Sequence, residues 1–149
     1  LSYIAAQIIQ KQIQRLKIES RIEFLGVLSE AEIKKRLLKT NVFVSPSIIE
    51  NQSTMLGEAM ILGVPSVASC VGAVLEMIDH GKDGLLYPFH EPYLLADAVC
   101  SIFSDPMKAK RLSEQGHAHA AKTYDREKNG QTLIEMYQTI ANAAKEREK

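Results

Sequence analysis

Two glutamates with a polar segment between them are the residues of this sequence best suited to bind a ligand. Seven residues separate Glu50 from Glu58, and Ser53 and Thr54 lie between them. The pattern predicts a helix that begins near Thr54, whose first backbone amides are free to bind an anion such as a phosphate. Glu58 lies one helical turn, about 6 Å, further along, and its side chain leans back towards that helix start.

The two carboxylates would flank this anion site, Glu50 from the preceding loop and Glu58 from the helix. Carboxylates accept hydrogen bonds from hydroxyl groups, so the set suits a sugar nucleotide, with one acid for each sugar ring. The residues alone leave a second interpretation open. In it, Glu50 is a solvated loop residue and Glu58 is an acid that stabilises a helix start.

Short apolar runs alternate with helical patterns around these glutamates. Runs too short for a helix predict strands over 22–25, 42–44, 66–69 and 85–87. Helical periodicity and stop signals such as Gly63 with Pro65 predict the helices between them. These helices are expected over 2–18, from Ser29 to about 39, 54–62, 75–78, 92–104, 106–122 and from Asp125 to about 144.

Capping residues define several of these helix starts. Ser29 and Glu32 have the spacing of a capping box, in which each residue satisfies a free amide of the other. Asp105 precedes a first-turn proline, and Asp125 precedes the last helical pattern, so both are expected to be N-caps.

Strands that alternate with helices indicate an α/β fold with a Rossmann-like, doubly wound and mainly parallel sheet covered on both faces. Ligands of such sheets bind beyond the carboxyl ends of the strands, which is where the loop 46–53 is expected. The apolar stripe of Ala5, Ile9, Ile13 and Leu16 predicts that the first helix covers the sheet.

Composition narrows the class of protein and of partner. The chain has 149 residues, of which 46% are hydrophobic, so it can bury a core and is neither disordered nor collagen-like. Eighteen basic residues balance eighteen acidic ones, so no net field attracts nucleic acid, and none is expected as a partner. Cys70 and Cys100 fit a reducing cytosol, and no apolar run approaches the roughly 18 residues that span a bilayer.

No metal site is expected from the four histidines. His117 and His119 lie two residues apart in a helical pattern and therefore point in different directions. We interpret all four as surface residues. The predictions for metal ions and for cofactors are both none.

The ordered motifs of the chain resemble the C-terminal domain of the family 4 glycosyltransferases, which are retaining enzymes with the GT-B fold. The resemblance covers nearly the whole chain, which makes it far more specific than two glutamates alone. It is carried by the run from Glu50 to Glu58, by 59–69, by Val71-Gly72 and by 81–86, with 24–26 and 41–47 in the same order.

The resemblance assigns roles to the residues of the loop and helix start. It implies that Glu50 is catalytic and contacts the transferred sugar, and that Glu58 contacts the nucleotide ribose. The phosphate is expected on the helix start between them, which makes Ser53, Thr54, Met55 and Leu56 substrate-binding. Asn51-Gln52-Ser53 stands where many members have glycines, and this polar version resembles capsule and sugar-polymer enzymes, which suggests polysaccharide biosynthesis.

The resemblance also implies a larger protein. The chain begins with Leu1, within a helical pattern, so we expect residues 1–149 to be a single-domain fragment of the nucleotide-sugar-binding half, inactive alone. The expected partners are a nucleotide-diphosphate sugar, an N-terminal acceptor domain and a glycan or lipid-linked acceptor. The full-length protein is expected in the cytoplasm, with peripheral attachment to the inner face of the membrane left open.

Two alternatives to a retaining hexosyltransferase stay open. The same half-sheet could be a non-catalytic nucleotide-binding or interaction module, because a fold does not establish a function. A GT-B nucleotide-sugar epimerase relative would share the nucleotide site.

The last helical pattern carries an apolar stripe for which the small sheet offers little room. Leu133, Met136, Tyr137 and Ile140 recur at helical spacing. We predict that residues beyond about 130 pack less completely than the rest and that Tyr137 is partly exposed.

Overall fold

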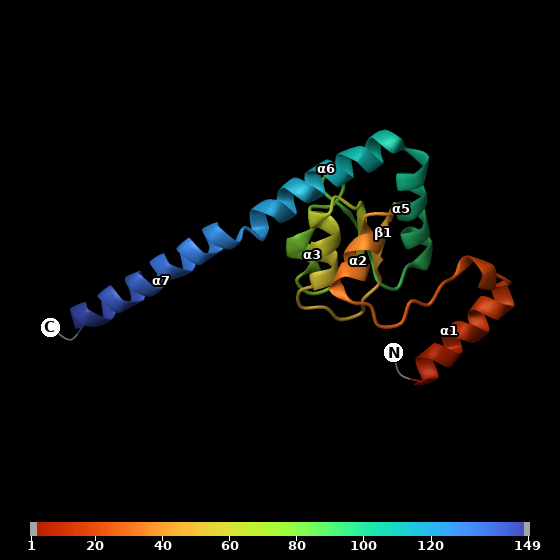
Figure 1. Cartoon of the computed structure of the whole chain (residues 1–149), viewed down its shortest axis with the longest axis horizontal. Helices are drawn as coiled ribbons and strands as arrows, with labels where there is room; N and C mark the ends of the chain where they lie inside the picture. Colours follow the sequence, from red (N-terminus) through yellow and green to blue (C-terminus); the bar gives the residue numbers. More distant parts are fainter. Residues whose placement is uncertain (1–2, 148–149) are drawn as a thin grey trace. The chain divides into compact units, whose positions relative to one another are not determined.

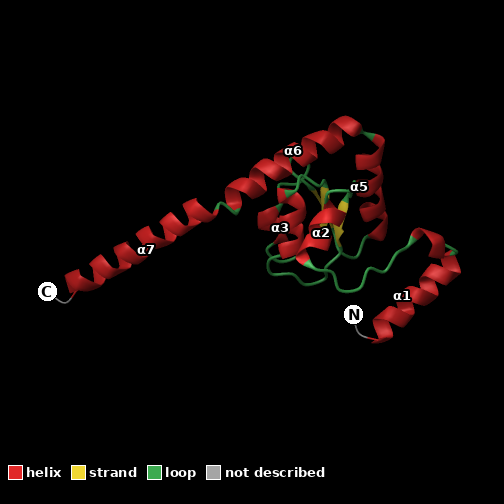
Figure 2. Cartoon of the chain, viewed as in Figure 1, coloured by secondary structure: helices red, strands yellow, loops and turns green. Residues whose placement is uncertain are grey.

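A computed structural model describes residues 3–147, which fall into two compact units, Leu1–Ile33 and Lys34–Lys149. Helices and loops make up most of the chain, and the short strands belong to the second unit (Figure 2). Within the described residues, none of the helices has both the length and the hydropathy needed to cross a membrane.

The first unit contains helix α1 (Tyr3–Leu16), the 3-10 turn η1 (Glu19–Arg21), an irregular segment and the first turn of the next helix. The strand predicted over 22–25 is wrong, because these residues adopt no strand and Phe24 is 67% exposed. Four residues cannot satisfy their own backbone groups without a neighbouring strand, and the described part of this unit contains none. The stripe of α1 is only partly covered, since Ile13 is buried whereas Ile9 and Leu16 are exposed.

Helix α2 (Glu30–Leu37) begins at the predicted capping box. The Ser29 backbone N–H donates to Glu32 Oε2 at 2.8 Å, as expected. The Ser29 hydroxyl donates to the same oxygen at 2.6 Å. The helix ends two residues earlier than predicted.

The second unit is built on a parallel sheet of three strands, not the four predicted. Its order is β1 (Phe43–Ser45), β2 (Ser66–Ser69) and β3 (Leu85–Tyr87). Both outer strands are in register with the central one, because Val44 and Leu85 lie opposite Val67. The predicted bounds are confirmed for β2 and β3 and shifted by one residue for β1.

Helices cover both faces of this sheet (Figure 1), which confirms the doubly wound α/β class. Helix α3 (Thr54–Ile61) packs on β1 and β2, and α5 (Pro92–Ser104) packs on β2 and β3. Helix α6 (Pro106–Thr123) contacts α3, α5 and β2, while the short α4 (Val74–Met77) connects β2 to β3.

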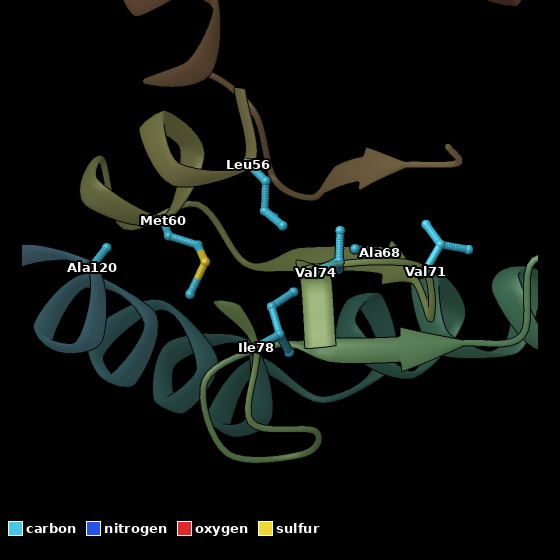
Figure 3. Packing of buried hydrophobic residues seen from close by; sticks show 7 residues of the cluster. All are labelled: Leu56, Met60, Ala68, Val71, Val74, Ile78 and Ala120. Carbon is cyan, nitrogen blue, oxygen red and sulfur yellow. The ribbon is translucent and has the colours of Figure 1, made fainter. Parts of the chain in front are cut away.

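The core has two parts because successive residues of β2 point to opposite faces. Val67 joins one cluster, with Leu85, Tyr87, Ile102 and Leu112. Ala68 joins the other, between α3, α4 and α6 (Figure 3), with Leu56, Met60, Val71, Val74, Ile78 and Ala120.

The C-terminal helices begin at the predicted caps. Asp105 accepts the amide of Lys108 at 3.0 Å, and Asp125 accepts the amide of Lys128 at 3.0 Å, which starts α7 (Arg126–Arg147). The side chains described in α7, residues 126–144, are all exposed, and Tyr137 is 66% exposed. The prediction of an incompletely packed last helix is confirmed.

Candidate functional site

The start of α3 is held by Ser53, the last residue of the loop that follows β1. Ser53 has an extended backbone, with φ −80° and ψ 101°, and its Oγ accepts the backbone N–H of Leu56 at 3.3 Å. Its carbonyl accepts the N–H of Gly57 at 3.0 Å, the first bond of the helix. The amides of Thr54 and Met55 therefore stand in the first turn, ahead of any helical carbonyl.

Leu56 has a structural role at this helix start. Its side chain is fully buried in the core, and its amide is taken by Ser53 Oγ. The buried side chain and the capped amide of Leu56 are therefore not available for the ligand contact expected of this residue. Thr54 and Met55, the first two residues of this turn, are exposed, so their amides are the candidate donors to a ligand.

Glu50 lies in the same loop, where the Ser47 hydroxyl contacts its carboxylate and the Ser69 hydroxyl anchors Ser47. Its side chain is half-buried, and Ser47 Oγ donates to Glu50 Oε2 at 3.2 Å. Ser69, at the carboxyl end of β2, donates to the carbonyl of Ser47 at 2.6 Å. The loop that carries Glu50 is thus tied to the neighbouring strand by a fully buried hydroxyl.

A second contact presses the turn after β2 against this loop. Gly72 has φ +50°, and a Cβ placed there would overlap the backbone carbonyl oxygen of Glu50. Only glycine fits this position, because the space of a side chain is occupied by backbone. The carboxyl ends of β1 and β2 therefore meet at Glu50.

Glu58 faces a hollow of about 320 Å³ on the exposed side of α3. Thr54 lies one turn before it and lines the same hollow, which confirms that the helix start and the second acid share a face. Glu50 does not line this hollow, although Gln52 from its loop does. The remaining lining residues are Gly57, Ile61 and Tyr124.

Tyr124 and Gln52 also line a second hollow, of about 260 Å³, between α3, α4 and α6. Glu76, His119 and Thr123 contribute its polar groups. Sequence reasoning missed Tyr124, because it lies between two helices and outside both periodic patterns. Its one local signal is an aromatic residue directly before the capping Asp125.

His119 is a structural partner, which corrects its interpretation as a surface residue. Its Nδ1 lies 2.6 Å from Asp83 Oδ2, and Asp83 is 2% exposed. Asp83 also accepts the amide of Asp79 at 2.7 Å. The pair fastens the turn before β3 to α6. His117 instead contacts the carbonyl of Ile61 at 2.6 Å, which confirms that the two histidines point in different directions.

Asp79 and Lys82 form an ion pair in the turn before β3, and the pKa values of both side chains are shifted. Lys82 Nζ donates to Asp79 Oδ2 at 2.8 Å, which lowers the pKa of Asp79 and raises the pKa of Lys82. At the end of β3, burial raises the pKa of Tyr87. Across the described residues, no three His, Cys, Asp or Glu side chains are grouped so as to hold a metal ion.

Comparison with known proteins shows what this arrangement is similar to. The family model described as "Glycosyl transferases group 1" matches residues 6–119. A "D-inositol 3-phosphate glycosyltransferase" from Corynebacterium urealyticum is 28% identical over 133 residues, which are 89% of this chain and 31% of that protein.

Solved structures share the fold over most of the chain. Anabaena Alr3699/HepE in complex with UDP matches with a TM-score of 0.84 and 27% identity, over 90% of this chain and 36% of that chain. The same protein has been solved with UDP-glucose. Sucrose-phosphate synthase from Thermosynechococcus elongatus matches with a TM-score of 0.82 and 26% identity, over 92% of this chain and 34% of that chain. The chain spans about a third of the length of these relatives.

Proposed function

Because this chain belongs to the family of group 1 glycosyl transferases, we propose that it is the nucleotide-sugar-binding part of a retaining hexosyltransferase. The family resemblance and the GT-B fold expected from the sequence are confirmed. The observation that carries the proposal is the match over 90% of the chain to a protein solved with UDP and with UDP-glucose.

The nucleotide is proposed to lie along the first turn of α3. The amides of Thr54 and Met55, at the positive end of the helix dipole, would bind the diphosphate. Glu58 would accept hydrogen bonds from the ribose hydroxyls, since its carboxylate shares the hollow with Thr54. Ser53 would act indirectly, because its hydroxyl holds the helix start in place.

Glu50 is proposed to bind hydroxyls of the transferred sugar. It lies in the loop before the helix start and does not line the hollow of Glu58, so the two acids could bind different parts of the donor. Ser47 supports the orientation of its carboxylate. A contact that strengthens as the sugar leaves the diphosphate would lower the barrier to transfer.

The rest of the reaction is proposed to depend on partners outside this chain. An N-terminal domain would hold a glycan or lipid-linked acceptor against the sugar, and the chemistry would follow from positioning and from stabilising the departing diphosphate. We propose polysaccharide biosynthesis in the cytoplasm as the setting, with peripheral attachment to the inner face of the membrane where the acceptor is lipid-linked.

A nuclear magnetic resonance titration of this chain with UDP and GDP tests the nucleotide site. We expect a Kd on the order of 1 mM, which corresponds to about 4 kcal/mol of binding free energy. The affinity is expected to be low because the two glutamates near the proposed phosphate site do not offset the negative charge of the diphosphate. Amide shifts should concentrate at residues 50–58, while the exposed residues 126–144 serve as an internal control. Shifts elsewhere with 50–58 unchanged would refute the site.

A further inference from the structure

We propose that the hydroxyl group of Tyr124 determines specificity for the ribose of the nucleotide, by binding the same vicinal diol as Glu58. The inference deepens the proposed function and rests on it. Tyr124 comes from the junction of α6 and α7, 66 residues after Glu58 in the sequence.

The position of Tyr124 is set by its ring and by its backbone. The ring is half-buried and packs against the core cluster of α3, α4 and α6, and the backbone N–H donates to Ala120 at 2.9 Å. The hydroxyl lies beside Gly57, because a Cβ built on that glycine would come within 2.9 Å of it. A glycine next to Glu58 therefore makes room for this phenol.

The hydroxyl is free of protein partners within the part of the chain that the structure describes. Among the described residues none forms a hydrogen bond with Tyr124 Oη, and this atom is not sealed from solvent. Phenylalanine would pack the same ring against the core without bringing a polar atom to the hollow. The hydroxyl is therefore available to a ligand in the hollow that Tyr124 and Glu58 line together.

The two side chains complement each other chemically. A carboxylate only accepts hydrogen bonds, whereas a phenol can also donate one. A vicinal diol presents both O–H donors and oxygen acceptors. Glu58 can accept hydrogen bonds from the hydroxyls of the diol while Tyr124 donates one to a diol oxygen, so the pair recognises a diol better than either group alone.

The test compares UDP with 2′,3′-dideoxy-UDP, which lacks the diol, on this chain and its Tyr124→Phe variant. We expect Tyr124→Phe to weaken the binding of UDP about 3- to 10-fold, as for the loss of one hydrogen bond. The affinity for the dideoxy nucleotide should stay unchanged. Tyr137→Phe, which removes an exposed hydroxyl on α7, is the matched control and should change neither affinity.

A second variant displaces the Tyr124 hydroxyl while keeping the tyrosine itself. Gly57→Ala places a methyl group 2.9 Å from Oη and 3.0 Å from Cζ, so the ring must move. It should reproduce the selective loss for UDP. If both variants discriminate between the two nucleotides as well as the unaltered chain does, the role of Tyr124 is wrong. Unaltered chain that binds neither UDP nor GDP would overturn the proposed function, and this inference with it.

Discussion

The backbone carbonyl oxygen of Glu50 fills the space in which a side chain at Gly72 would begin. This contact joins the loop after β1 to the turn after β2, at the edge of the sheet where the first acid lies. Gly72 is also in the left-handed region, with φ +50°, so two independent restraints favour glycine there.

Replacing Gly72 with alanine should distort the loop that carries Glu50. Gly81 provides the matched control, since it has φ +80° but nothing within 4 Å of a built Cβ. Gly81→Ala is destabilised only by the strain of a positive φ at a non-glycine residue, whereas Gly72→Ala must also displace the Glu50 carbonyl. We expect Gly72→Ala to lower the free energy of unfolding by about 2 kcal/mol more than Gly81→Ala in urea denaturation. Equal losses would show that the overlap is relieved without cost.

The Ser69 hydroxyl is expected to order the same loop through a second contact, at Ser47. Ser69→Ala removes its bond to the Ser47 carbonyl, whereas Ser66→Ala on the same strand removes a local bond to Val64. Each substitution should cost about 1 kcal/mol of stability. Hydrogen exchange of the amides of residues 47–51 should accelerate about 5-fold in Ser69→Ala alone. Acceleration by both variants would mean that the loop responds only to global stability.

Substitutions of the two glutamates are expected to lower the affinity for different ligands. Glu58→Ala is expected to weaken the binding of UDP and of UDP-glucose alike, by about 10-fold or more, because a charged hydrogen-bond acceptor for the ribose is lost. Glu50→Ala should weaken UDP-glucose and leave UDP nearly unchanged, since UDP lacks the transferred sugar. Titration calorimetry or nuclear magnetic resonance measures both affinities, with Glu135→Ala, on the exposed helix α7, as the control. An equal effect of the two substitutions on UDP would contradict this division of roles.

Tyr87 should make the folded state sensitive to alkali. Burial raises its pKa above the ordinary value of 10.0, so the unfolded chain releases the phenol proton at a lower pH than the folded chain. Stability is therefore unaffected below pH 10 and falls as pH rises towards the folded pKa. Tyr87→Phe should remove this component, seen as a smaller loss of unfolding free energy between pH 9 and pH 11. Tyr93→Phe, at a side chain that is 85% exposed, should leave the wild-type dependence intact.

Local chemistry in the sequence determined most element boundaries and the shape of the helix start at the candidate site. Ser53 caps α3 and Pro92 begins α5 because such signals act within one turn of backbone. Glu58 and Thr54 share a face for the same reason, since they lie four residues apart on one helix. These features require nothing from distant parts of the chain.

Tertiary structure alone decided which distant groups support that helix start. Ser69 holds Ser47 across 22 residues, Asp83 meets His119 across 36, and Tyr124 reaches the hollow of Glu58 from beyond α6. The run 22–25 failed as a strand for a related reason, because an apolar segment becomes a strand only where a partner satisfies its backbone. Such contacts depend on strand register and on helix packing, which bring together residues that no local pattern connects.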